Sequence, residues 1–431
     1  MTGTKLKRVV LIIGINILMI GGGLLVLDLI LMATGVFPPR YELGDADVGW
    51  TATPSTGAMI TDSCVDFSTG TTYEYARNDD GVRTSFTSEE LRADTTHYEI
   101  AVTGDSHTDL CAPNELTHPG VLAAALRERG VPAREVPFGA GRYSPLQGYL
   151  IFKKTLEPYG PDAFVLNVYT GNDFNDMMRV DDRPYMVQDS GGYRIHAPEW
   201  YRLADPNRVY RSRVRYAFRS LLDAFGIANL YFRFRFLSAA AAQQGKGLFT
   251  VFAYVNDLRR SVEPSVGYPE AFTAQFLNQQ LFFHHFTGSF DESLRRLRAL
   301  LEEVRREYPD VLLILSAIPS YQLTTPRAEA DSALLAVTDR IPVDFDAGVA
   351  QESRLYHSLA EMAVASGWLF VDNLAALRDY KGSERLYNTF DYHLTPVASE
   401  IVGHAQADVL WTELTGDAAG SQSSRERQPA N

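Results

Sequence analysis

Through most of the chain, short apolar runs alternate with stretches in which apolar residues recur at helical spacing. Short apolar runs, typical of buried strands, occupy residues 98–103, 135–138, 163–170, 311–317 and 368–371. Stretches with helical spacing occupy residues 118–129, 145–156, 291–308, 351–365 and 396–410. Strands that alternate with helices form a parallel sheet covered on both faces. The pattern therefore predicts an α/β fold whose core comprises residues 96–180 and 291–415.

Three regions depart from this alternation. Residues 34–95 are rich in Gly, Thr, Asp and Ser, which predicts a loop-rich or β-rich segment. Residues 181–290 are aromatic and Arg-rich, and we expect a helical insertion that caps or flanks the site; a separate domain is the alternative. The arginines between Arg208 and Arg235 fit a solvated face or a surface for an anionic polymer. Residues 416–431 are small and polar, which predicts a disordered tail.

The N-terminus carries the pattern of a membrane anchor. Lys5, Lys7 and Arg8 precede an apolar run over residues 9–33, which as a helix would span roughly 37 Å. The positive-inside rule keeps residues 1–8 in the cytoplasm and places the remainder outside, as in a single-pass membrane protein. A cleaved signal peptide is an alternative, but a small-x-small cleavage site is missing. A buried core helix is the other alternative, and few such helices are this long.

Charge and cysteine content narrow the choice of partners. The 431 residues have a formal net charge of -13, which disfavours nucleic acid as the main partner. In an exported protein, Cys64 and Cys111 can form one disulfide; a pair of buried free thiols is the alternative. Neither these cysteines nor His284 and His285 have the neighbours of a metal site, so we expect no metal and no cofactor.

The predicted strand ends bring together the residue types of nucleophilic catalysis. Ser106 follows the first strand, Gly139 ends the second, Asn172 follows the third, and Asp391 and His393 lie beyond the fifth. In a parallel α/β sheet, ligands bind at the carboxyl ends of the strands. A histidine can take the serine proton and a carboxylate can orient the histidine. Glycine and serine N–H groups and an asparagine amide can bind the oxyanion.

These residues resemble the motif blocks of the SGNH (GDSL-type) hydrolases. Gly104-Asp105-Ser106 is similar to the first block, Gly139 to the glycine of the second, Gly171-Asn172-Asp173 to part of the third, and His393 to the histidine of the fifth. The resemblance implies a flavodoxin-like three-layer α/β/α sandwich. It also implies Ser106, His393 and Asp391 as catalytic residues, with Ser106, Gly139 and Asn172 as the oxyanion hole. Its membrane-anchored layout looks like bacterial envelope members of this family.

Two positions depart from the family pattern. The family has Asp three residues before the histidine, where this chain has Phe390; Asp391 lies two before. His107 follows the serine where an apolar residue is usual, and we interpret it as a pocket wall rather than a second base. Gly141 is the alternative to Gly139, and Asn172 has the alternative role of a helix cap.

The predicted function is hydrolysis of O-acyl esters, acetyl above all, on an extracytoplasmic glycan or related envelope substrate. Transfer of the acyl group to a sugar hydroxyl would use the same residues. The alternative from a different functional class is an envelope protein that has no catalytic activity and serves in binding or assembly.

Overall fold

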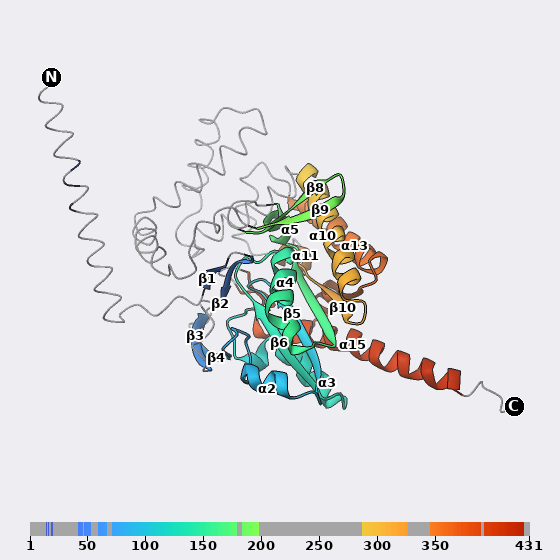
Figure 1. Cartoon of the computed structure of the whole chain (residues 1–431). Coiled ribbons are helices and arrows are strands. Elements are labelled where there is room, and N and C mark those ends of the chain that lie inside the picture. The colour runs from blue at the N-terminus through green and yellow to red at the C-terminus, as the bar shows by residue number, and fades with distance from the viewer. Residues whose placement is uncertain are drawn as a thin grey trace, which may run out of the picture.

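The computed structural model describes residues 42–45, 47–52, 59–66, 71–178, 183–197, 287–325, 345–388 and 392–425, together with Gly14, Asn16 and Met19. Figure 1 shows a central sheet with helices on both sides.

The central sheet has five parallel strands. They are β5 (Tyr98–Gly104), β6 (Ala133–Gly139), β7 (Ala163–Tyr169), β10 (Leu312–Ile318) and β11 (Leu369–Asp372). Their order across the sheet is β11-β10-β7-β5-β6. Counted along the chain this is the flavodoxin-like order 2-1-3-4-5, with its switch point between β5 and β7. The predicted three-layer α/β fold is confirmed.

Helices cover both faces because successive strand residues point to opposite sides. Ile100 and Val102 of β5 pack in a core with α3 (His118–Glu128) and α15 (Pro396–Arg425). Ala101 faces the other core, which includes residues of α4 (Pro145–Ile151), α10 (Thr287–Glu307) and α13 (Phe345–Ala365). The predicted helices are present; α4 ends at Ile151, where η2 (Phe152–Leu156) follows, and α15 extends fifteen residues beyond its predicted end.

Shorter helices lie at the ends of these elements. They are α2 (Ser88–Ala93), η1 (Asn114–Leu116), η2 (Phe152–Leu156), η3 (Glu157–Tyr159), α5 (Asp173–Met177), α11 (Tyr321–Thr324) and α14 (Asn373–Arg378). Of these, α5 follows β7 directly, so it begins at the carboxyl edge of the sheet.

The segment before the sheet is β-rich where it is described. One antiparallel pair joins β1 (Glu42–Asp45) to β2 (Gly49–Ala52), and a second joins β3 (Ile60–Asp66) to β4 (Thr71–Arg77). Trp50 is buried in the core that α4 shares with the sheet, and the Tyr143 hydroxyl donates to its carbonyl. This segment therefore packs as part of the same domain as the central sheet.

Two predictions about the remaining regions need correction. The described start of the 181–290 insertion is a β-hairpin of β8 (Tyr185–Asp189) and β9 (Gly192–His196), not a helix. Ser190 and Gly191 form its two-residue turn, and Gly192, which starts β9, has φ +119°. Helix α15 continues to Arg425, so residues 416–425 are helical rather than disordered. Residues 416–425 contain no proline, so the helix of α15 continues through them despite Gly416 and Gly420. The rest of the insertion, residues 198–286, lies outside the described residues.

Only Gly14, Asn16 and Met19 of the predicted anchor are described. Among the described residues, no helix has the length and apolarity needed to cross a membrane.

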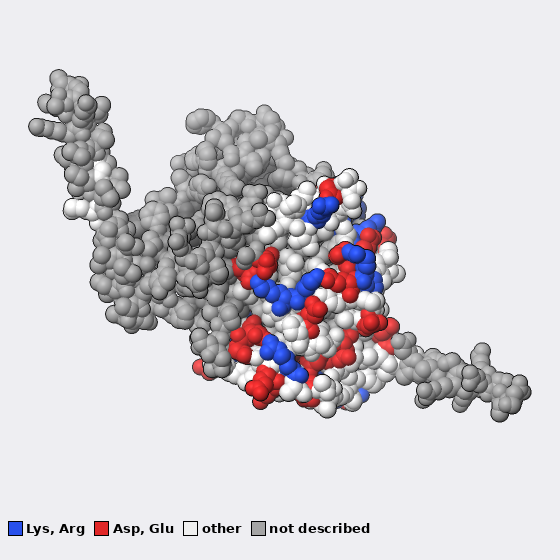
Figure 2. All heavy atoms as spheres, viewed as in Figure 1, with Lys and Arg blue, Asp and Glu red and all other residues white. Residues whose placement is uncertain are grey.

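The face shown in Figure 2 carries basic and acidic side chains side by side. Lys153 pairs with Glu307, and Lys154 pairs with Asp45 and Asp47. Among the described residues drawn there, the two signs of charge are mixed rather than gathered into one patch.

Candidate active site

Ser106 and His393 meet at the carboxyl edge of the sheet. His393 Nε2 lies 2.6 Å from Ser106 Oγ, although 287 residues separate them. Ser106 lies in the turn after β5, and His393 lies shortly before α15. This distance allows direct proton transfer between hydroxyl and imidazole.

The nucleophile turn, residues 104–109, is fixed by its own backbone. The amides of Thr108 and Asp109 both donate to the Asp105 carbonyl at 3.1 Å. The His107 amide donates to Asp105 Oδ1 at 2.9 Å. Gly104 is required because a Cβ there would lie 2.2 Å from Thr108 Oγ1. Ser106 is thus held in a tightly packed turn that has no room for a side chain at position 104.

Gly139 lies directly against this turn. It pairs with Gly104 in the parallel ladder between β5 and β6. A Cβ on Gly139 would approach the Asp109 nitrogen to 2.6 Å and the Asp105 oxygen to 2.9 Å. Both are backbone atoms of the nucleophile turn, so they can move only if the turn itself moves. The predicted oxyanion glycine is therefore at the position where only glycine allows this close packing.

Asn172 occupies the N-cap position of α5 without capping it. Its side chain makes no capping hydrogen bond to the helix. Instead, its Nδ2 donates to Asp176 Oδ2 at 2.8 Å. The alternative of a simple helix cap is therefore wrong.

His107 forms a wall beside His393. Its ring centroid lies 3.9 Å from that of Tyr169 and 4.9 Å from that of His393. His107 is buried, and its Nδ1 accepts a long hydrogen bond from the Leu394 amide, 3.4 Å. Since Leu394 follows His393, this ring helps to hold the histidine loop in place.

Buried carboxyl groups surround the serine turn. Burial raises the pKa of Asp105 to about 6, while the charge of His393 opposes the rise and that of Asp176 adds to it. Burial, reinforced by the charge of Asp105, raises the pKa of Asp173 well above its ordinary range. Asp105 therefore lies within electrostatic range of Asp173, Asp176 and His393.

Asp391 lies outside the described residues, so its predicted role stays a prediction. An extended chain at residues 391–393 would put the side chains of Asp391 and His393 on one side, but Tyr392 has φ +54°, in the left-handed region, so the chain is not extended there. The buried Tyr392 ring packs against Tyr321 with centroids 4.5 Å apart, and this packing offsets the backbone cost.

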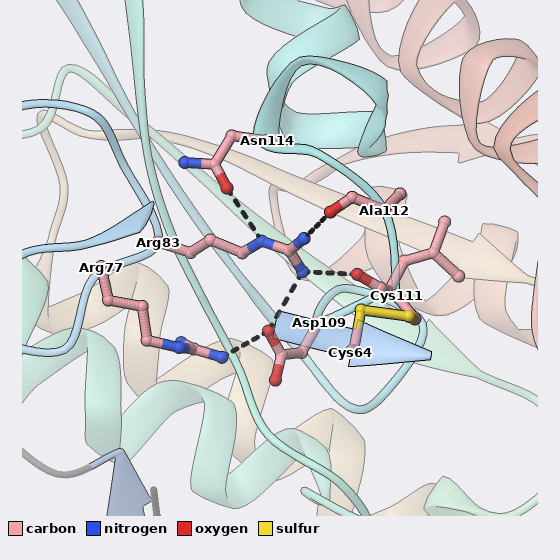
Figure 3. The surroundings of a disulfide bond; sticks show 8 residues. Cys64, Arg77, Arg83, Asp109, Cys111, Ala112 and Asn114 are labelled. Carbon is pink, nitrogen blue, oxygen red and sulfur yellow. Dashed lines mark hydrogen bonds and ion pairs between the residues drawn. A yellow bond between two sulfur atoms is a disulfide. The ribbon is translucent and has the colours of Figure 1, made fainter. Parts of the chain in front are cut away.

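The predicted disulfide between Cys64 and Cys111 is present. It joins β3 to the segment that follows the nucleophile turn (Figure 3). The Arg83 guanidinium fastens the same segment, donating to the Leu110 carbonyl at 2.5 Å and to Asn114 Oδ1 at 3.1 Å. Asp109, the last residue of the turn, accepts from both Arg77 and Arg83.

Two buried polar networks near the site were not predicted. Gln406 Nε2 donates to Asn167 Oδ1 and to Ser316 Oγ, each at 2.8 Å, and Asn167 Nδ2 donates to Thr108 Oγ1 at 3.2 Å. This chain of hydrogen bonds runs from α15 through the sheet to the nucleophile turn. Polar residues inside strongly apolar strands, such as Asn167 in β7, are the sequence signal that could have revealed it.

The second network centres on Glu352 of α13, which is fully buried. It accepts hydrogen bonds from the Thr170 hydroxyl at 2.5 Å, the Ser320 hydroxyl at 2.6 Å and the Ser320 amide at 3.1 Å. Burial raises the pKa of Glu352 above its usual range. The carboxyl group therefore connects the loops after β7 and β10, the first of which leads into Asn172.

Comparison with known proteins gives matches only among solved structures. No family model and no curated protein matches the chain. A lipase/acylhydrolase from Enterococcus faecalis is 13% identical with a TM-score of 0.34, over 73% of this chain and 94% of that one. A catalytic mutant of the acetylxylan esterase Axe2 from Geobacillus stearothermophilus is 12% identical with a TM-score of 0.36, over 72% and 93%. A lipolytic protein of the G-D-S-L family from Desulfitobacterium hafniense is 11% identical with a TM-score of 0.31, over 73% and 99%.

The chain resembles esterases and lipases of the GDSL type. At these identities and TM-scores the likeness carries no argument about the site. The choice of a reaction therefore depends on the geometry of Ser106, His393 and their neighbours.

Proposed function

We propose that this chain is a serine esterase of the SGNH type that acts on O-acyl esters, with acetyl groups on an extracytoplasmic glycan as its substrate class. The observation that carries the proposal is the 2.6 Å contact between His393 Nε2 and Ser106 Oγ, at the carboxyl edge of a flavodoxin-like sheet. The tight fit of Gly139 against the serine turn supports it, as does the Asn172 amide, which does not cap its helix.

In the proposed reaction, Ser106 Oγ attacks the ester carbonyl carbon while His393 Nε2 accepts the hydroxyl proton. The amides of Ser106 and Gly139 and Nδ2 of Asn172 donate to the oxyanion. Collapse of the intermediate breaks the bond to the sugar oxygen, and His393 returns the proton to that oxygen. An acyl-serine remains.

Water then attacks the acyl-serine with His393 as general base, releasing the carboxylic acid and Ser106. A sugar hydroxyl in place of water would give acyl transfer. The charge of Asp105 stabilises the imidazolium in both half-reactions, and Asp391 is the proposed orienting acid.

We place the catalytic domain outside the cytoplasm, anchored by residues 9–33. The Cys64–Cys111 disulfide supports this location, since disulfides persist in oxidising compartments. The basic residues Lys5, Lys7 and Arg8 before the apolar run set the orientation. A C-terminal reporter that works only outside the cytoplasm should be active, and activity of a cytoplasm-only reporter would reverse the orientation.

Activity is tested with the full chain in mild detergent and a panel of chromogenic acyl esters. Wild type is compared with Ser106→Ala and with Ser358→Ala, a serine of α13 whose hydroxyl donates to its own helix. We expect Ser106→Ala to abolish turnover and acyl-enzyme formation seen by mass spectrometry, with Ser358→Ala unaffected. Equal turnover in wild type and Ser106→Ala would refute serine catalysis. Adding oligosaccharide acceptors and measuring acylated product against free acid then separates transfer from hydrolysis.

A further inference from the structure

A buried ion pair lies directly behind the Asn172 amide. Asp176 accepts from Asn172 Nδ2 through Oδ2, and its other oxygen, Oδ1, lies 3.0 Å from Arg183 Nη1. The Asp176 and Arg183 side chains are 6% and 0% exposed. A carboxylate held by an arginine can only accept hydrogen bonds. The Asn172 amide must therefore turn its nitrogen, not its oxygen, toward Asp176.

This constraint matters because an asparagine amide has two faces of opposite polarity. An amide nitrogen carries two hydrogens, so Nδ2 can donate one to Asp176 and keep the second for another acceptor. If the Asn172 amide were flipped, its oxygen would occupy the position of Nδ2 and face the Asp176 carboxylate, which is also an acceptor. An oxygen facing a developing oxyanion repels it, whereas an N–H stabilises it.

Arg183 also reaches the loop that follows the oxyanion glycine. Its Nη1 donates to the Arg142 carbonyl at 3.0 Å, and its guanidinium lies 5.2 Å from the centroid of the Trp50 ring. Arg142 has φ +63°, a left-handed conformation that is uncommon for a non-glycine residue. One guanidinium thus connects the loop after β6, which carries Gly139, with the loop after β7, which carries Asn172.

We propose that Asp176 and Arg183 are positioning residues that fix the Asn172 amide with its N–H toward the oxyanion. This proposal rests on the proposed role of Asn172 in oxyanion binding. Asp176 and Arg183 act through Asn172 and do not touch the reacting atoms.

The test compares Asp176→Asn in two backgrounds, wild type and Asn172→Ala. In the wild-type background the new amide can accept or donate, so the Asn172 amide loses its fixed orientation. We expect kcat on a chromogenic acetyl ester to fall about tenfold to a hundredfold, less than the roughly 10²- to 10³-fold loss known for complete removal of an oxyanion donor because the amide is misoriented rather than removed, with KM changed less than about threefold. In the Asn172→Ala background, the same substitution should change kcat less than about twofold.

Two further variants separate positioning from stability. Arg183→Lys keeps the charge but loses the forked geometry, and should show an intermediate loss of kcat that also disappears in the Asn172→Ala background. Glu99→Gln is the matched control, because Glu99 and Arg134 form a buried ion pair at the start of β5 and β6, far along the strands from the serine. It should lower the melting temperature while kcat stays within about twofold of wild type.

Equal losses from Asp176→Asn in both backgrounds would overturn the proposal and leave the pair a purely structural one. Wild-type kcat in Asp176→Asn would overturn it as well. Failure of the proposed function is distinguishable, because Asn172→Ala alone would then keep wild-type kcat or Ser106→Ala would keep turnover.

Discussion

Replacement of Gly139 by alanine tests the close packing of β6 against the nucleophile turn. The added Cβ would lie 2.6 Å from the Asp109 nitrogen, roughly 0.8 Å short of the 3.4 Å at which ordinary contact begins. The obstacle is backbone, and the same turn carries Ser106. Relief of the clash must therefore move either β6 or the serine.

The expected cost comes from this displacement. Forcing one methyl group into a packed interior costs about 1–3 kcal/mol of unfolding free energy. A misplacement of about 1 Å in a reacting group can reduce the rate about a hundredfold. We expect kcat/KM for a chromogenic acetyl ester to fall by about that factor, with the loss mainly in kcat, and the melting temperature to decrease.

Gly148→Ala is the matched control. Its Cβ would meet Leu166 Cδ1 at 2.9 Å and Thr103 Oγ1 at 3.0 Å, which are side-chain atoms on the same sheet. The leucine methyl can move, so we expect a smaller loss of stability and kcat/KM within about threefold of wild type. Wild-type activity in Gly139→Ala, or equal losses in the two variants, would refute the assignment of Gly139 as the glycine of the oxyanion hole.

Three further predictions concern stability around the site. Replacing both Cys64 and Cys111 by serine should lower the unfolding free energy by about 4 kcal/mol on the chain-entropy model for a 47-residue separation, and urea titration that shows no loss would contradict it. Burial lowers the pKa of His118 to about 4, below the unfolded value of about 6.5. The neutral His118 therefore contributes its full share of stability above pH 6.5, and the free energy of unfolding falls by about 3 kcal/mol as the pH decreases from 6.5 toward 4. His118→Gln should flatten that part of the pH profile of unfolding free energy, and an unchanged slope would exclude His118 as its source. Glu352→Ala removes the carboxylate acceptor of the buried Thr170 and Ser320 hydroxyls, while the Ser320 amide keeps Thr170 Oγ1, and should cost about 3 kcal/mol. Glu352→Gln keeps one acceptor oxygen and should cost less; equal melting temperatures for the two variants would contradict this.

The sheet could be predicted because its strands are buried on both faces. Such strands give continuous apolar runs, and β7 is buried along its whole length. The position of Ser106 could be predicted from the same pattern, since it comes directly after such a run. The hairpin β8–β9 was missed because its residues are mostly exposed, so no apolar face marked the strand period.

The geometry of the histidine loop could not be predicted from spacing. Alternation of side chains holds only for an extended chain, and the left-handed Tyr392 breaks it one residue before His393. A tyrosine gives no local signal for φ +54°, because burial of its ring among Tyr321 and its neighbours makes the conformation favourable. Tertiary packing thus overrides the local backbone preference at the residue that precedes His393.

Some residues of the candidate site can be recognised from the local sequence, whereas others depend on contacts with distant parts of the chain. A Gly-Asp-Ser turn and a nearby Asn are visible in the sequence because they come directly after strands. Gln406 and Arg183 are not, because each acts on a loop far away in the chain: Gln406 through Asn167 on Thr108, and Arg183 through Asp176 on Asn172. A helix glutamine or a loop arginine is ordinarily solvated, and only complete burial distinguishes these two. Buried polar side chains that end at a catalytic loop are costly unless every bond is made, and this cost is the physical reason to expect that they hold the loop in one conformation.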